Sequence, residues 1–167
     1  MTLFLSSMTS GLIATGVMIV FLYLPVFWRG VHYDTLGAIG SILLNEVNTR
    51  SRMLGALLLL VGGVLVAFFY GWYTLMFLDG PFPAPPYIIF LGSPVEINLF
   101  YPLFGLVAGF CHGIFITLIT TFVITDHHPV ESYRQVYPLI LSFIIGHTVY
   151  GVTVMLLQSQ FLQFFAG

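Results

Sequence analysis

The sequence predicts an all-α integral membrane protein: a single domain of four transmembrane helices with a short amphipathic helix lying in the membrane plane. Three observations support this prediction. Hydrophobic residues make up 59% of the chain and charged residues only 6%, whereas a soluble domain carries roughly 25% charged residues. Four apolar stretches are each long enough to cross a bilayer, which takes about 20 residues. Nearly all the charge falls between those stretches.

The predicted spanning helices cover residues 4–28, 54–78, 101–125 and 137–160 of the single domain 1–167. Only helices and closed barrels satisfy every backbone hydrogen bond in lipid. These runs are too long and too uniformly apolar for the alternating strands of a barrel, so helices are the expected structure. Pro25 is expected to kink the first helix or to mark its last turn.

Between the first two spans, residues 34–48 are predicted to form the in-plane helix. Asp34 is the expected N-cap, and Asn45 and Glu46 give the segment a polar side. A helix of this kind lies on the membrane surface, either as a simple connector or with its polar edge against a neighbour. Its apolar positions recur at helical spacing and are Leu36, Ile39, Leu43 and Val47.

The placement of the basic residues predicts the orientation in the inner (plasma) membrane. By the positive-inside rule, loops that carry Lys or Arg stay in the cytoplasm. The first and third loops carry all the arginines and the second carries none, so both termini and the second loop are expected outside the cytoplasm. The chain has no lysine, and its arginines are Arg29, Arg50, Arg52 and Arg134.

The second loop, residues 79–98, is predicted to be the main partner-docking element. Its prolines forbid a continuous helix and favour extended, polyproline-like backbone. Its large apolar side chains are too hydrophobic to be left in water, so they should bury themselves in a partner. The alternative is that they fold back onto the protein's own helices or into lipid. The predicted docking residues are Pro81, Phe82, Tyr87, Ile88, Ile89, Phe90 and Leu91.

Two histidines, His112 and His147, lie near the centres of the third and fourth spans. Ionisable groups at that depth are costly and usually mark a function. Neutral imidazole is a common ligand for metals, and the glycines beside both histidines would leave room for a macrocycle. Haem b held by both histidines, or a chlorophyll-type pigment held by one, would fit this pattern. The alternatives are hydrogen bonding between helices, with the glycines serving close packing, or a proton path.

The sequence shows no catalytic set, and the protein is predicted not to be an enzyme. It has no nucleophile elbow, phosphate-binding loop or dinucleotide fingerprint. The polar third loop contains His127 and His128, but Pro129 interrupts it and no further ligand completes a metal site. The net charge of −2 argues against a nucleic-acid partner. The single cysteine, Cys111, is expected to be a buried free thiol.

Two short motifs carry a resemblance to a known family. They are GLIATGVMIVF at residues 11–21 and GHTVYG at residues 146–151. Both are similar to sequences in a family of small prokaryotic four-helix integral membrane proteins of unknown function. The resemblance implies the four-helix fold and brings no activity with it.

The predicted function is that of a non-catalytic accessory or structural subunit of a larger membrane complex, of electron transport or photosynthesis. It rests on the lack of a catalytic set and on surfaces suited to partners, namely the second loop and a small-residue ridge at Gly63, Ala67 and Gly71. Other membrane subunits and lipids are the expected partners, and no cofactor is required. The alternative is a haem- or pigment-binding membrane protein that uses His112 and His147.

Overall fold

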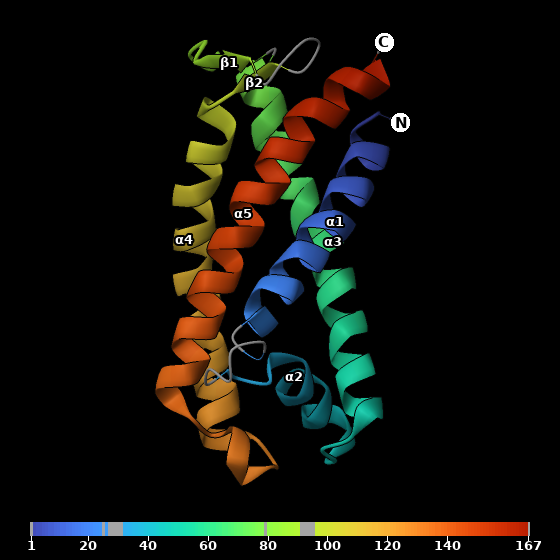
Figure 1. Ribbon diagram of the computed structural model, residues 1–167, viewed down its shortest axis with the longest axis vertical. Helices are drawn as coiled ribbons and strands as arrows, with labels where there is room; N and C mark the ends of the chain where they lie inside the picture. Colours follow the sequence, from blue (N-terminus) through green and yellow to red (C-terminus); the bar gives the residue numbers. More distant parts are fainter. Residues whose placement is uncertain (1, 25, 27–31, 79, 91–95, 167) are drawn as a thin grey trace.

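The protein is a membrane bundle whose four long helices run along a common axis, as Figure 1 shows. The computed structural model describes residues 2–24, 26, 32–78, 80–90 and 96–166. Each long helix is apolar enough to cross a membrane, which confirms the predicted fold class. The long helices are α1 (Thr2–Tyr23), α3 (Thr49–Leu78), α4 (Phe100–Thr121, continued by a π-helical turn at Phe122–Asp126) and α5 (Val136–Ala166).

The helix boundaries differ from the predicted ones at several ends. α1 ends at Tyr23, before Pro25, because proline lacks an N–H group and its ring disfavours helical backbone in the preceding residue. α3 begins at Thr49 rather than at residue 54, and α5 continues to Ala166 rather than to residue 160. At the start of α3, charged and polar residues do not stop the helix, so the apolar stretch alone underestimates its length.

The spanning helices pack in the order α4, α5, α1, α3. α4 and α5 approach most closely through small residues, since a Cβ atom added to Gly105 or to Gly151 would overlap the carbonyl oxygen of the other. Close approach of this kind stabilises helix pairs in lipid, where burial of apolar surface does not. Gly105, Gly109 and Gly113 follow one another at four-residue steps and all face α5, so this glycine ridge is used inside the protein.

The small-residue ridge on α3 is also used inside the protein. A Cβ atom added to Gly63 would collide with Thr15 of α1, and one added to Gly71 would collide with Gln158 of α5. Ala67, between them, is fully buried. The ridge therefore gives no support to a partner surface on α3.

The helix α2 (Thr35–Leu44) lies across the bundle axis and packs on α3. Asp34 caps it as predicted, because its side chain accepts a 3.0 Å hydrogen bond from the Gly37 amide. The helix ends before residue 48. Asn45 takes a left-handed conformation (φ 54°) and its amide bonds to the Ser41 carbonyl, which closes the last turn.

The fully buried positions of α2 are small residues, among them Gly37, Ala38 and Ser41. Ile39 and Ile42 are partly buried and pack against the neighbouring hydrophobic cluster. At the end of the helix Leu43 is 64% exposed. A helix with one side packed on the bundle and apolar side chains left exposed on the other is suited to the edge of the lipid, which agrees with the predicted in-plane placement.

The second loop contains a short hairpin that the all-α prediction did not include. β1 (Ile88–Phe90) pairs antiparallel with β2 (Glu96–Asn98). The Leu99 amide donates a 2.8 Å hydrogen bond to the Tyr87 carbonyl, which extends the pairing. The hairpin lies at the same end of the bundle as both chain termini (Figure 1).

Candidate functional site: a cleft between α3 and α4

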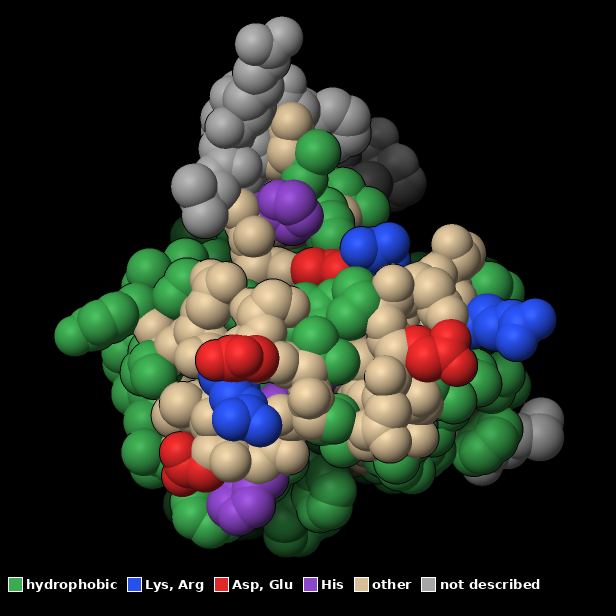
Figure 2. Space-filling model, turned by 90° about the horizontal axis from the view of Figure 1, so that it is seen from below, with side chains coloured by type: hydrophobic (Ala, Val, Ile, Leu, Met, Phe, Trp, Pro, Cys, Tyr) green, Lys and Arg blue, Asp and Glu red, His purple; other side chains and the backbone are tan. Residues whose placement is uncertain are grey.

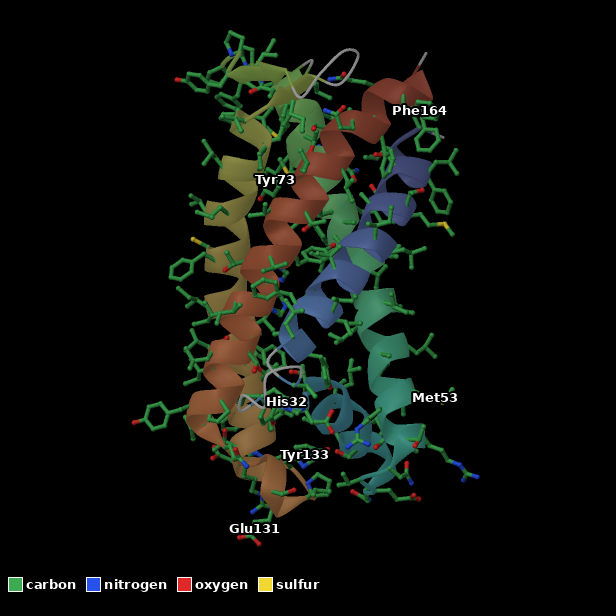
Figure 3. The ribbon with its side chains drawn as sticks, viewed as in Figure 1. His32, Met53, Tyr73, Glu131, Tyr133 and Phe164 are labelled. Atoms are coloured by element: carbon green, nitrogen blue, oxygen red, sulfur yellow. The ribbon has the colours of Figure 1, made fainter. Side chains whose placement is uncertain are left out.

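The neighbouring helices α3 and α4 do not pack backbone against backbone. Toward the hairpin, aromatic side chains bridge the gap between them: Phe77 contacts Phe100 and Phe104 with ring centroids 4.9 and 4.8 Å apart. Tyr73, in the upper half of the bundle in Figure 3, contacts Phe104 at 5.9 Å. These four side chains form an aromatic bridge, and below it the helices enclose a cleft.

The cleft has a volume of about 170 Å³ and is lined by side chains from all four spanning helices. Leu58 on its α3 side is 39% exposed, and a Cβ atom added to Gly62 would meet no atom within 4 Å. The cleft is therefore open sideways, toward lipid. Most of its lining is aliphatic, and its polar side chains are those of Thr15, His112, His147 and Tyr150.

The two predicted site residues, His112 and His147, meet at this cleft. Their rings are in edge contact, with centroids 4.8 Å apart and planes at 77°. Nδ1 of His147 lies 2.7 Å from the Phe143 carbonyl oxygen, one turn earlier on α5. Because a carbonyl only accepts, Nδ1 carries the proton, and Nε2 of the neutral ring is left with its lone pair.

Two buried polar atoms at or near His112 lack hydrogen-bond partners in the described part of the chain. The Nδ1 atom of His112 is buried and has no hydrogen-bond partner among the described residues. The same is true of the hydroxyl of Tyr70, whose ring centroid lies 6.4 Å from that of His112. Buried polar groups are nearly always hydrogen-bonded, so unpaired ones point to a water or a ligand.

The contact between the two imidazoles bears on the haem prediction. Axial ligands of one haem lie on opposite faces of the macrocycle, which requires a gap between their rings. No such gap exists between His112 and His147, so a haem held by both would require α4 and α5 to separate. A haem or pigment held by one histidine would not. Within the described residues neither histidine hydrogen-bonds to the other helix, so the predicted interhelical bond is not formed.

A second polar group, which the sequence analysis missed, lies at the opposite end of the bundle from the hairpin. Asp34 accepts hydrogen bonds at Oδ1 from the Tyr23 hydroxyl (2.7 Å) and the Gly37 amide (3.0 Å). At Oδ2 it accepts from Arg52 and Tyr133, both at 2.9 Å. We call these residues the Asp34 cluster. Figure 2 views this end, where charged and histidine side chains gather.

The Asp34 cluster shifts the pKa values of its members. Burial by itself raises the pKa of Asp34, but hydrogen bonds from Tyr23, Gly37, Arg52 and Tyr133 together hold it below its usual value. Burial and the bond to Asp34 raise the pKa of Tyr133 to about 12. A charged carboxylate with neutral phenols as donors is therefore the stable form of the cluster at neutral pH.

His128 joins the third loop to α2 and is fully buried. Its Nε2 lies 2.8 Å from the Ala38 carbonyl and donates to it, while Nδ1 accepts from the Val130 amide at 3.0 Å. In the sequence, His128 stands beside His127 in the polar third loop. No signal separates it from His127, because the fold of the loop over α2 decides which of two adjacent side chains points inward.

A third polar group, also unexpected, lies inside the membrane-spanning region. Gln158 of α5 is fully buried and donates a 2.9 Å hydrogen bond to the Ser7 hydroxyl of α1. The Ser10 hydroxyl bonds to the Gln158 side-chain oxygen. A buried amide of this kind ties the two helices together in lipid.

The predicted docking residues of the second loop are largely exposed where the structure describes them. Pro81 is exposed, and Phe82, Tyr87 and Ile88 are 62%, 60% and 47% exposed. Ile89 and Phe90 belong to β1, but their side chains, and all of Leu91, lie outside the described part of the structure. Cys111, expected to be buried, is exposed on the outer face of α4.

The helices and the sideways cleft define a multi-pass membrane protein with four candidate spans. No protein-family model, curated protein or solved structure matches the chain. The resemblance of residues 11–21 and 146–151 to a family of four-helix membrane proteins therefore stays a prediction.

Proposed function

We propose that this protein is a non-catalytic accessory subunit of a larger membrane protein complex, of electron transport or photosynthesis. The observation that carries the proposal is the exposure of Phe82, Tyr87 and Ile88 on the loop beyond α3 and α4. Large apolar side chains that leave the lipid-facing helices and stay uncovered are typical of a surface that meets another protein. Electron transport and photosynthesis are named on a general expectation, because complexes of those kinds carry small helical subunits.

Hydrogen bonds fix the backbone in the described part of the loop, which favours docking. β1 pairs with β2, the side-chain amide of Asn98 donates a 3.0 Å hydrogen bond to the Pro85 carbonyl, and the backbone amide of Ala84 donates at 2.9 Å to the Phe77 carbonyl of α3. A preorganised segment loses little conformational entropy when it binds. Each large side chain that becomes fully buried contributes roughly 1.5–3 kcal/mol, so two anchors decide whether a subunit stays attached.

Placement in the inner (plasma) membrane, with both termini and this loop outside the cytoplasm, is part of the proposal. The described arginines, Arg50, Arg52 and Arg134, belong to the end opposite the loop, and by the positive-inside rule that end faces the cytoplasm. Other integral subunits and lipids are then the partners available to the loop.

The test is affinity purification of the tagged chain from its own membranes in a mild detergent. Membrane subunits should co-elute with the wild-type chain, and the double variant Phe82→Ser/Tyr87→Ser should lower their yield at least tenfold. Tyr137→Ser is the matched control, because Tyr137 is 81% exposed at the opposite end of the bundle. Elution of the wild-type chain as a stable, lone monomer would contradict the proposal.

A haem- or pigment-binding protein is the second candidate, favoured by the meeting of His112 and His147 at one cleft. Because the two rings are in contact, one histidine would be the axial ligand. This candidate requires a Soret or pigment absorption band in the purified chain. The band should disappear in one of the two variants, His112→Ala or His147→Ala. A colourless, folded preparation from native membranes would exclude this candidate.

A further inference from the structure

The cleft between α3 and α4 has a size and an opening that restrict what it can bind. Its volume is about 170 Å³, and a cavity of roughly 150 Å³ holds one benzene-sized ring. It opens toward lipid beside Leu58 and Gly62. A ligand with a single ring and an apolar tail would place the ring in the cleft and leave the tail among the lipid chains.

The polar groups of the cleft restrict the ligand further. Nε2 of His147 offers a lone pair, because the proton of the ring is on Nδ1 and is donated to Phe143. His112 lines the same cleft, and its buried Nδ1 has no hydrogen-bond partner in the described residues. A neutral imidazole always has one N–H group and one lone pair. With the lone pair on the buried Nδ1, the N–H group is on Nε2 and is available to a bound group, so the two rings together offer one acceptor and one donor.

The hydroxyl protons of Tyr150 and Thr15, which also line the cleft, are already used. The Tyr150 hydroxyl donates a 2.5 Å hydrogen bond to the Gly63 carbonyl of α3. The Thr15 hydroxyl donates to the Gly11 carbonyl at 2.8 Å. Among the polar side chains of the cleft, a free donor for a ligand therefore comes from the histidines.

We propose that this cleft binds the head ring of a lipid-soluble quinol. A phenolic hydroxyl both donates and accepts, so one such group can donate to Nε2 of His147 while it accepts from His112. A quinone carbonyl only accepts and leaves the lone pair of His147 unpaired. The site therefore prefers the reduced form of the ligand to the oxidised form. The inference goes beyond the accessory role and does not depend on the second loop.

The probe is a benzoquinol with a decyl tail, titrated anaerobically into the purified chain in lipid nanodiscs. Saturable one-to-one binding is expected, weakened at least tenfold for the corresponding quinone and for decylbenzene, which has no hydroxyl group. If decylbenzene binds as tightly as the quinol, the cleft is only a site for apolar molecules and the proposal is overturned. Equal or tighter binding of the quinone would overturn the assignment of His147 as the acceptor.

Two variants connect the binding to the cleft. Gly62→Leu should abolish it, because the side chain enters the open space at the cleft without displacing any atom near its Cβ. Gly16→Leu is the matched control, since a Cβ on Gly16 of α1 also meets no atom within 4 Å. Unchanged binding in Gly62→Leu, or equal loss in both variants, would overturn the site.

A third variant tests the hydrogen bond to His147. His147→Phe keeps a flat ring but removes Nε2, and should weaken quinol binding roughly tenfold, the effect of about one hydrogen bond. It should leave the binding of decylbenzene unchanged. If quinol binding is unaffected, His147 is not the acceptor. All of these measurements use the isolated chain, so their failure would leave the co-purification test of the accessory role untouched.

Discussion

The phenol of Tyr133 donates a 2.9 Å hydrogen bond to the carboxylate of Asp34, which lies 99 positions earlier in the chain. This bond joins the connection between α4 and α5 to the N-terminus of α2. The Tyr33 hydroxyl adds a second link, donating at 2.9 Å to the Tyr133 carbonyl. The two halves of the chain are thus held together at this end by polar contacts, in addition to the packing of α1 on α5.

Removal of the Tyr133 hydroxyl should weaken the bundle. Tyr133→Phe removes one donor to a charged carboxylate, and a hydrogen bond of that kind contributes about 1.5–3 kcal/mol. We expect a lower midpoint of thermal unfolding in detergent. Tyr137→Phe, which alters an exposed side chain, is the control. Identical midpoints for Tyr133→Phe and the wild type would show that the bond contributes nothing to stability.

The Asp34 cluster should also make stability depend on pH in the acid range. The pKa of Asp34 is lower in the folded protein than in the unfolded chain, where it is about 3.9. The stabilisation is therefore fully present well above the unfolded pKa, from about pH 5 upward, and is lost as the pH falls through the folded pKa. Thermal unfolding measured from pH 7 to pH 3 should show a steeper decline for the wild type than for Asp34→Asn. Parallel curves would contradict the lowered pKa.

Close packing of α4 on α5 should make Gly105 intolerant of any side chain. Alanine normally favours a helix over glycine by up to about 1 kcal/mol, but at Gly105 its Cβ atom would overlap the Gly151 carbonyl. We expect Gly105→Ala to lower the unfolding midpoint and Gly16→Ala, where the added atom meets open space, to leave it unchanged or raise it. Equal effects at both positions would mean that the α4–α5 contact is looser than described.

The buried amide of Gln158 should contribute measurably to the contact between α1 and α5. Gln158→Leu leaves the Ser7 hydroxyl without this donor, and interhelical hydrogen bonds in membranes contribute about 0.6 kcal/mol on average. A small decrease in the unfolding midpoint is expected. Gln163→Leu, at an exposed position on the same helix, is the control and should have no effect. If Gln163→Leu lowers the unfolding midpoint as much as Gln158→Leu does, the burial of Gln158 is not the cause.

Membrane orientation can be tested by cysteine labelling in a Cys111→Ser background. Phe82→Cys places a thiol on the second loop, and Glu46→Cys places one at the opposite end, both at exposed positions. A membrane-impermeant maleimide should label the first in intact cells and the second only after permeabilisation. The reverse pattern would invert the proposed topology.

Length and composition were sufficient to predict the four spans but not all of their ends, and the position of Asp34 before an apolar helical pattern was sufficient to predict the N-cap. The second loop was expected to be extended, and its described part contains a hairpin, because the pairing of β1 with β2 depends on contacts between two separate segments and not on proline content. The meeting of His112 and His147 was expected only as the proximity of two neighbouring helices. Their edge contact, and the donation from Nδ1 of His147 to Phe143, depend on side-chain orientation.

The number of candidate spans could be predicted from length and composition, since lipid admits long apolar helices whatever they pack against. Which faces of those helices meet is a property of the folded bundle. Lipid is as apolar as a protein core, so the two faces of a spanning helix do not differ in hydrophobicity. Small residues at four-residue steps, such as Gly105, Gly109 and Gly113, mark a buried face but do not specify which helix packs on it. The Asp34 cluster, the burial of His128 and the cleft between α3 and α4 all follow from that choice of faces.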